Sequence, residues 1–357
     1  NLRINGPATG DVNFRQLRLL RGDLDLNTSS FILFGTTTNS NNIRVANGIR
    51  RILGLPGSSI SIEGTASTGQ TNLNVVPDNT ATDFLFIDGD ATLATSVGVR
   101  FTNTIINGSF QINTNGFVTG TSGNAGDAPI YGATSSLIYN NGAGGFLRNF
   151  EWTAETLGTL GITPGYPNNI IIRNSTPLEI GSTSAQVTSG QRDRALAGNL
   201  TIESGSSITL NNMPNKLIVG GNLVIDGGLT LSTAAGGDVW VYGDWRRGLG
   251  TGNATSFVPN GRSVWFKGSS AQLINSDEAG GEQFFGLGID KTSSSQTVRL
   301  VSNATVNGTC GIDNGILDVD LRTLTLNDQV TRGTGGSFVS QPDGLVVYNR
   351  SGGSQNV

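Results

Sequence analysis

Two pairs of carboxylates are the residues in this sequence best spaced to do chemistry. Asp88 and Asp90 flank a glycine, and Asp318 and Asp320 stand two positions apart in an apolar run. Paired carboxylates can serve as acid and base, or together with Ca²⁺, in cleaving polysaccharides. Positions i and i+2 of a strand face the same side, so we expect Asp318 and Asp320 to point together to solvent. Asp88-Gly89-Asp90 is typical of a turn, and we interpret both pairs as structural.

Histidine is absent, and Cys310 is the single cysteine. The absence of histidine removes the commonest general base and the commonest metal ligand, together with every Ser-His or Cys-His arrangement. A lone cysteine cannot form an intrachain disulfide, and we expect Cys310 to be a small buried apolar residue. The glycine-and-aspartate nonapeptide that binds Ca²⁺ in some repeat proteins is not found, so structural Ca²⁺ has no sequence support. We therefore expect no catalytic residue, no metal site and no cofactor.

Aromatic residues beside arginines are the candidates for contact with a ligand or a surface. They are Trp245 with Arg246 and Arg247, and Arg148 with Trp152. An aromatic face next to a forked guanidinium suits the recognition of sugars. The interpretation favoured for each cluster is that it packs a loop onto the body of the protein.

Composition points to many short strands joined by tight turns. The chain has 357 residues, of which 52 are glycine and 13% are charged, and its formal net charge is −4. Short runs of Leu, Ile, Val and Thr alternate with clusters of Gly, Asn and Ser. No dense basic run provides phosphate contacts, so nucleic acid is not an expected partner. No apolar run approaches the roughly 20 residues that span a bilayer, so no membrane span is expected.

A repeat of about 22 to 25 residues organises the chain. The run at residues 198–202 (Gly-Asn-Leu-Thr-Ile) recurs at 221–225 and, altered, at 243–245, with offsets of 23 and 22 residues. The preceding strands, at 216–219, 238–241 and 263–266, recur with offsets of 22 and 25. Such a period fits one coil of two or three short strands, with equivalent residues of stacked coils about 4.8 Å apart. The fold class expected is therefore all-β, a parallel β-helix (β-solenoid) with loop insertions.

Stacking gives particular residues structural roles. Asn199, Asn222 and Asp244 should lie one above another at a turn, where Asn and Asp tolerate left-handed backbone and can satisfy neighbouring polar groups. Trp240 and Trp265 should lie on neighbouring coils. We favour an aromatic ladder that holds coils in register over a ligand-binding stripe.

The whole of residues 1–357 is expected to be one continuous solenoid segment of a larger protein. The clearest repeats fall in residues 198–357, and residues 101–197 look like middle coils with long loops. Residues 1–100 match the repeat only loosely. No linker interrupts the pattern.

Two blocks of motifs resemble a known family. One block runs through residues 283–292 (QFFGLGIDKT), 298–300, 304–309 and 315–319, and the other through 123–126, 128–132, 136–140, 151–152 and 165–169. Together they are similar to the repeats of very large surface proteins that Bacteroidota export by the type IX system. The resemblance implies secretion to the cell surface and a stalk or filament that serves adhesion, gliding or capture. The export signal and the sorting domain of that family are not found here.

These observations predict a non-enzymatic, extracellular structural or adhesive protein. Its expected partners are other copies of itself or further repeats, giving a homo-oligomer, and cell-surface glycans or other surfaces. The alternative is a secreted polysaccharide lyase or glycoside hydrolase on the same scaffold, which would need three or more carboxylates with an arginine in one groove. The sequence shows no such clustering within the aligned coils.

Overall fold

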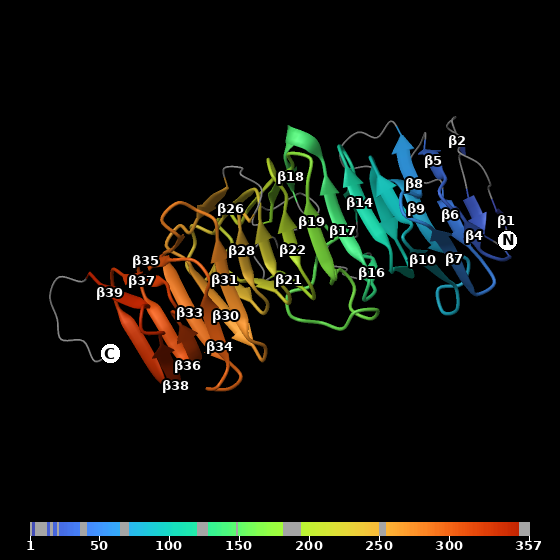
Figure 1. The fold of residues 1–357 in the computed structure, drawn as a ribbon. Coiled ribbons are helices and arrows are strands. Elements are labelled where there is room, and N and C mark those ends of the chain that lie inside the picture. The colour runs from blue at the N-terminus through green and yellow to red at the C-terminus, as the bar shows by residue number, and fades with distance from the viewer. Residues whose placement is uncertain are drawn as a thin grey trace. The chain divides into compact units, whose positions relative to one another are not determined.

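A computed structural model of the chain describes residues 2–3, 13–14, 17–19, 21–35, 41–64, 71–119, 128–147, 149–180, 194–249 and 255–349. Their regular secondary structure is β-strand, apart from a short 3₁₀ helix, η2 (Gly142–Gly144). In this part of the chain no helix is long and apolar enough to cross a membrane. The strands follow one another around each coil, and in most of the chain each pairs in parallel with the strand three places further on (Figure 1).

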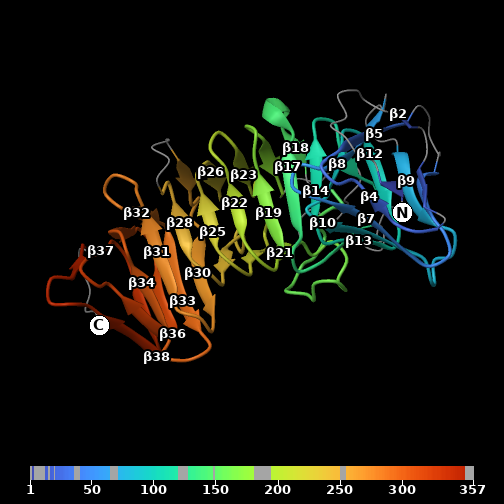
Figure 2. The same cartoon turned by 45° about the vertical axis from the view of Figure 1, so that its right-hand side comes forward.

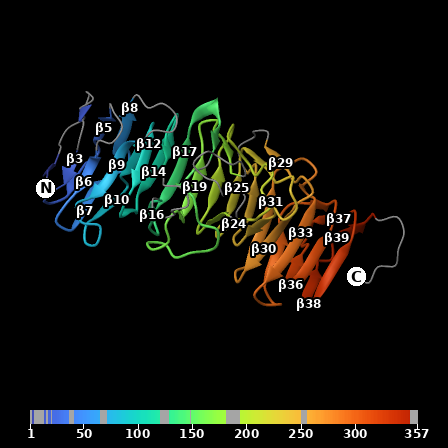
Figure 3. The same ribbon diagram turned by 180° about the vertical axis from the view of Figure 1, so that it is seen from behind.

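The chain forms two compact units, residues 1–178 with 183–190 and residues 179–182 with 191–357. In the first unit the strands form three rows, and each row is a parallel sheet with one strand from each successive coil. In the first row, β7 and β10 lie side by side in Figure 3. The first row is β1 (Leu2–Arg3), β4 (Leu24–Asp25), β7 (Ile49–Gly54), β10 (Phe84–Gly89), β13 (Thr104–Ile106) and β16 (Ile130–Tyr131). The second is β2 (Asn13–Phe14), β5 (Ser30–Gly35), β8 (Ser59–Gly64), β11 (Thr92–Thr95), β14 (Ser109–Asn113), β17 (Ser136–Asn140) and β19 (Asn169–Ile172). The third is β3 (Leu17–Leu19), β6 (Asn41–Val45), β9 (Thr71–Pro77), β12 (Gly98–Phe101) and β15 (Phe117–Val118).

Two further strands flank β19 in the sequence, one before it and one after it. They are β18 (Phe146–Leu147) and β20 (Pro177–Glu179), and the sequence boundary between the two units falls within β20.

The second unit repeats the arrangement, and β25, β28, β31 and β34 of its second row lie side by side in Figure 2. Its first row is β21 (Arg194–Leu196), β24 (Leu217–Val219), β27 (Val239–Val241), β30 (Ser263–Gly268), β33 (Gly286–Lys291), β36 (Cys310–Asp318) and β38 (Val330–Val339). The second is β22 (Leu200–Ile202), β25 (Leu223–Ile225), β28 (Trp245–Arg247), β31 (Gln272–Ser276) and β34 (Thr297–Leu300), which also pairs with β36. The third side carries β23 (Ser207–Thr209), β26 (Gly228–Thr230) and β29 (Ser256–Val258), then β32 (Glu282–Phe284), β35 (Ala304–Val306), β37 (Thr323–Leu326) and β39 (Leu345–Tyr348).

Alternation along each strand builds the core. Leu217, Val239, Val264, Leu287 and Cys310 occupy one register position on successive coils, and all are almost completely buried. Apolar side chains that point inward therefore stack on the same chemistry in the next coil, and outward positions stay partly exposed. Cys310 is the buried residue that was expected, and burial raises the pKa of its thiol to about 12.

Asparagine makes the tight corners. Left-handed backbone outside glycine occurs at nine described residues, of which seven are asparagines: Asn27, Asn47, Asn103, Asn115, Asn174, Asn211 and Asn260, with Ser175 and Asp320 completing the set. Asparagine tolerates this conformation because its short side-chain amide forms hydrogen bonds with nearby backbone groups. The abundance of Asn between strands is thus a direct requirement of the sharp turns.

The structure confirms the parallel β-helix and its period. Leu200 pairs with Leu223 and Leu223 with Trp245, which reproduces the offsets of 23 and 22 residues. One expectation is wrong in detail: Asp318 and Asp320 do not share a strand face. The strand ends at Asp318, whose Oδ1 accepts the backbone N–H of Asp320 at 2.9 Å, and Asp320 adopts left-handed backbone. The short acidic residue favours a turn over continued strand.

Candidate functional site

An amide ladder marks one corner of the second unit, as expected for Asn199, Asn222 and Asp244. The Oδ1 atom of Asn199 accepts the backbone N–H of Asn222 at 2.8 Å, and Oδ1 of Asn222 accepts that of Asp244 at 2.8 Å. Asp244 continues the ladder to the backbone N–H of Leu273 at 2.9 Å. Each side chain therefore satisfies a donor of the next coil and fixes the register of the stack.

Trp240 and Trp265 lie in register on β27 and β30 and point outward, while their strand neighbours are buried. Around them lies a set that we call the tryptophan face: Lys216, Trp240, Tyr242, Trp265, Lys267 and Asp290. Lysines cover the rings, because Nζ of Lys216 lies 4.6 Å and Nζ of Lys267 lies 4.3 Å from the centroid of Trp240. Three coils are thus joined by cation–π contacts, each worth about 0.5–2 kcal/mol.

Lys267 connects the two tryptophans to the coil beyond them. Its Nζ lies 5.3 Å from the Trp265 centroid and forms an ion pair with Asp290. Partial burial, aided by the Asp290 carboxylate, raises the pKa of Tyr242, so this hydroxyl stays protonated at neutral pH. Trp240 and Trp265 therefore occupy the same position on neighbouring coils, as expected from the sequence, and Lys267, a partner that the sequence did not reveal, lies near both rings.

A buried amine lies behind this face. Lys291 is 2% exposed, and its Nζ donates to the backbone carbonyl of Lys267 at 2.9 Å and to the side-chain oxygen of Gln272. Gln272 is held in turn by the carbonyls of Val241 and Gly243. Burial lowers the pKa of Lys291 to about 8, because the charged form loses its hydration.

This lowered pKa predicts that stability rises with pH. Below about pH 8 Lys291 is protonated in the folded and the unfolded chain alike, whereas between about pH 8 and 10 only the unfolded chain holds the proton. The urea midpoint should therefore increase with pH across this window, and Lys291→Met should flatten the increase. A slope that is equally steep in Lys291→Met would assign the pH dependence to another group.

The cluster of Trp245 and Arg247 is internal, so neither residue is a surface contact. Trp245 is 0% exposed and donates its Nε1–H to Oε2 of Glu282 at 2.7 Å. Arg247 donates to Oε1 of the same carboxylate at 2.8 Å and to Oγ1 of Thr255 at 3.0 Å. Both occupy inward positions on β28, in register with Leu223 and Ile225. Both residues are buried and bond the Glu282 carboxylate inside the coil, so they do not contact a ligand at the surface.

Arg246, between them on β28, is exposed and pairs with Asp244 at 2.8 Å. It is the one member of this triplet that remains available to a partner. Such an exposed pair adds little stability, typically below about 1 kcal/mol.

The second aromatic candidate is also internal. Trp152 is 0% exposed, and the neighbouring Glu151 accepts the Tyr139 hydroxyl at 3.0 Å and the backbone N–H of Asn149 at 2.8 Å. Arg148 lies outside the described residues. Trp152 therefore packs the segment that follows β18 into the first unit, which is the interpretation favoured from sequence.

Three aspartates of the first unit, Asp78, Asp83 and Asp88, form hydrogen bonds or ion pairs with neighbouring segments. Asp88 pairs with Arg51 and accepts Nδ2–H of Asn107 at 2.6 Å.

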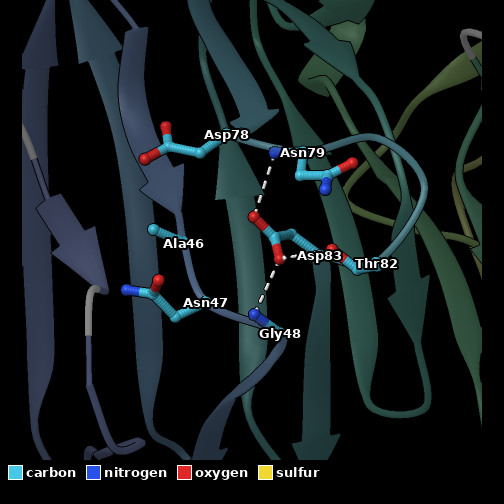
Figure 4. A pocket seen from close by; sticks show the side chains of 7 residues that line it. All are labelled: Ala46, Asn47, Gly48, Asp78, Asn79, Thr82 and Asp83. Atoms are coloured by element: carbon cyan, nitrogen blue, oxygen red, sulfur yellow. Dashed lines mark hydrogen bonds between the residues drawn. The ribbon is translucent and has the colours of Figure 1, made fainter.

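Asp83 lines an open hollow of about 400 Å³, together with Ala46, Asn47, Gly48, Asp78, Asn79 and Thr82 (Figure 4). Its carboxylate accepts the N–H groups of Gly48 at 2.7 Å and Asn79 at 3.0 Å, which lowers its pKa. Asp78 is paired with Arg44, so the hollow has no free acidic pair.

Metal binding finds no support in the described part of the chain. No group of three or more His, Cys, Asp or Glu side chains there is placed to hold an ion. The tryptophan face brings indole, ammonium and carboxylate groups together on the second unit, which are groups that can take part in recognition.

Sequence reasoning missed most of the tryptophan face. Lys267 and Asp290 are in register on adjacent coils, and Gly288 stands in register with Trp265. The signal was the offset of 23 residues, which aligns the run at 264–267 with that at 287–290.

Comparison of the chain with protein-family models, with curated proteins and with solved structures finds no match.

Proposed function

We propose that this chain is a non-enzymatic structural or adhesive protein of the cell surface, in which a stack of coils forms a stiff stalk, filament or appendage. Secretion by the type IX system, and a role in attachment, gliding or capture, belong to the same proposal and rest on the motif resemblance. The observation that supports it is the continuous coil-to-coil pairing within each unit, reinforced at the corner by the Asn199–Asn222–Asp244 ladder. Parallel backbone hydrogen bonds of this kind resist extension coil by coil.

No specific observation favours the lyase or hydrolase alternative. The carboxylates described above are committed to other groups: Glu282 to Arg247, Asp88 to Arg51, and Asp83 to backbone N–H groups. The tryptophan face carries one carboxylate, Asp290, which is paired with Lys267. Most glycoside hydrolases use two carboxyl groups that flank the scissile bond.

Pulling the purified chain between its ends tests the proposal. A coil of about 23 residues contributes about 75–80 Å of contour length when extended, so the force trace should show a series of steps of that size. The same preparation should release no oligosaccharides from neutral or acidic polysaccharides, with or without Ca²⁺. Smooth extension at low force would contradict the mechanical role, and released oligosaccharides would favour the enzymatic alternative.

A further inference from the structure

The ring of Trp265 lies flat along the outer surface of the second unit. A Cβ placed on Gly288, the residue in register on the next coil, would fall 2.2 Å from Cδ2 and Cε3 of that ring. A Cβ on Gly311, one coil further, would be 3.8 Å from Cη2. The indole therefore spans two coils, with one face against the backbone of Gly288 and its outer end beside Gly311.

Polar groups surround the outer end of this ring. The position of a Cβ on Gly311 is 3.2 Å from Oγ1 of Thr331 and 4.0 Å from Oδ1 of Asp313. Asp313 is exposed, and Trp265 and Thr331 are partly exposed. An aromatic edge, a hydroxyl and a carboxylate thus converge over a backbone position that has no side chain.

Room for the tryptophan does not explain Gly311. Gly288 alone makes space for the ring, because any side chain there would overlap it. At Gly311 an alanine would meet Trp265 at an ordinary contact distance of 3.8 Å and only a hydroxyl at 3.2 Å. Glycine inside a strand costs roughly 0.5–1 kcal/mol relative to alanine, so its presence here calls for another reason.

We propose that the surface formed by Trp265, Thr331 and Asp313 binds a neutral hexopyranose ring of a polysaccharide. The apolar face of such a ring packs on an indole, and its hydroxyls exchange hydrogen bonds with Thr331 and Asp313. The exposed carboxylate of Asp313 lies beside the end of the indole, where it repels an acidic sugar and so favours a neutral one. This inference rests on the proposed adhesive function and names the ligand class for it.

Titration with cellohexaose, laminarihexaose and mannohexaose, followed by calorimetry, tests the site. At least one of them should bind, and Trp265→Ala should weaken that binding more than tenfold. Asp313→Ala should weaken it about fivefold, because the carboxylate is exposed and holds hydroxyls without supporting the fold. Asp328→Ala, a matched loss of an exposed acid at another corner, should leave the affinity unchanged.

A shape-preserving variant separates binding from folding. Thr331→Val keeps the volume of the side chain and removes the hydroxyl, so it should weaken binding while the far-UV circular dichroism stays that of the parent. Failure of all three hexasaccharides to bind would overturn the inference, as would binding that survives both Trp265→Ala and Asp313→Ala. Stepwise unfolding under force would persist in either case, so the proposed structural role would stand by itself.

Discussion

Glu282→Leu is expected to lower the free energy of unfolding by about 3 kcal/mol or more. Glu282 is 0% exposed and is the partner of Arg247, whose side chain is 8% exposed. Removing one member of a buried ion pair leaves the other charge uncompensated, which typically costs 3–5 kcal/mol. Arg247 keeps a second carboxylate, Glu278, at 3.3 Å, so the lower end of that range is expected. Urea unfolding followed by tryptophan fluorescence measures the loss, because Trp245 also bonds Glu282.

Two further variants show whether the buried charge is the cause. Arg246→Ala removes an exposed arginine from the same strand and should change stability by less than about 1 kcal/mol. The double variant Arg247→Leu with Glu282→Leu should recover much of the loss, because apolar residues can replace a buried pair. A double variant as unstable as Glu282→Leu would instead point to lost packing around the Trp245 ring.

Much of the fold follows from the sequence because one period governs several features at once. The Gly-Asn pairs recur at the coil spacing since each side-chain oxygen must accept an N–H one coil further on. The same alignment already contained the position of Trp245, which takes the place of the inward Leu223. A large aromatic residue beside two arginines suggests a surface position. That local pattern favoured surface contact for Trp245, although its alignment with Leu223 places it inside.

The partners of these residues could not be predicted in the same way. Glu282 lies 35 residues beyond Arg247, on the third side of the coil, and a single sequence offers no means of selecting it from other acids. The flat placement of Trp265 depends on Gly288, which is one of many glycines and differs from them only in register. Contacts across a coil interior or along the outer face depend on loop lengths that vary from coil to coil. The repeat thus determines the stack, while the site depends on departures from the repeat.

Gly221→Ala is the second substitution with a large expected effect. Gly221 belongs to the Gly-Asn pair of the ladder, and a Cβ there would fall 2.7 Å from the carbonyl carbon and 2.8 Å from the carbonyl oxygen of Gly198. It would also fall 2.6 Å from Oδ1 of Asn199, the acceptor for Asn222. Backbone cannot yield as a flexible side chain can, so the two coils must separate locally. Overpacking of this kind costs about 1–3 kcal/mol, and the lost ladder bond places Gly221→Ala near the upper end.

Gly311→Ala is the matched control, because it adds the same methyl group on the same unit where the closest atom is the Thr331 hydroxyl at 3.2 Å. Its free energy of unfolding should stay within about 0.5 kcal/mol of the parent, or increase, since alanine restricts the unfolded chain. Hydrogen exchange locates the damage in Gly221→Ala: the amides of Asn222 and Asp244 should lose protection, since both donate to the ladder. Equal losses of stability in both variants would show that glycine flexibility, and not the close approach of the coils, is what the Gly-Asn repeat preserves.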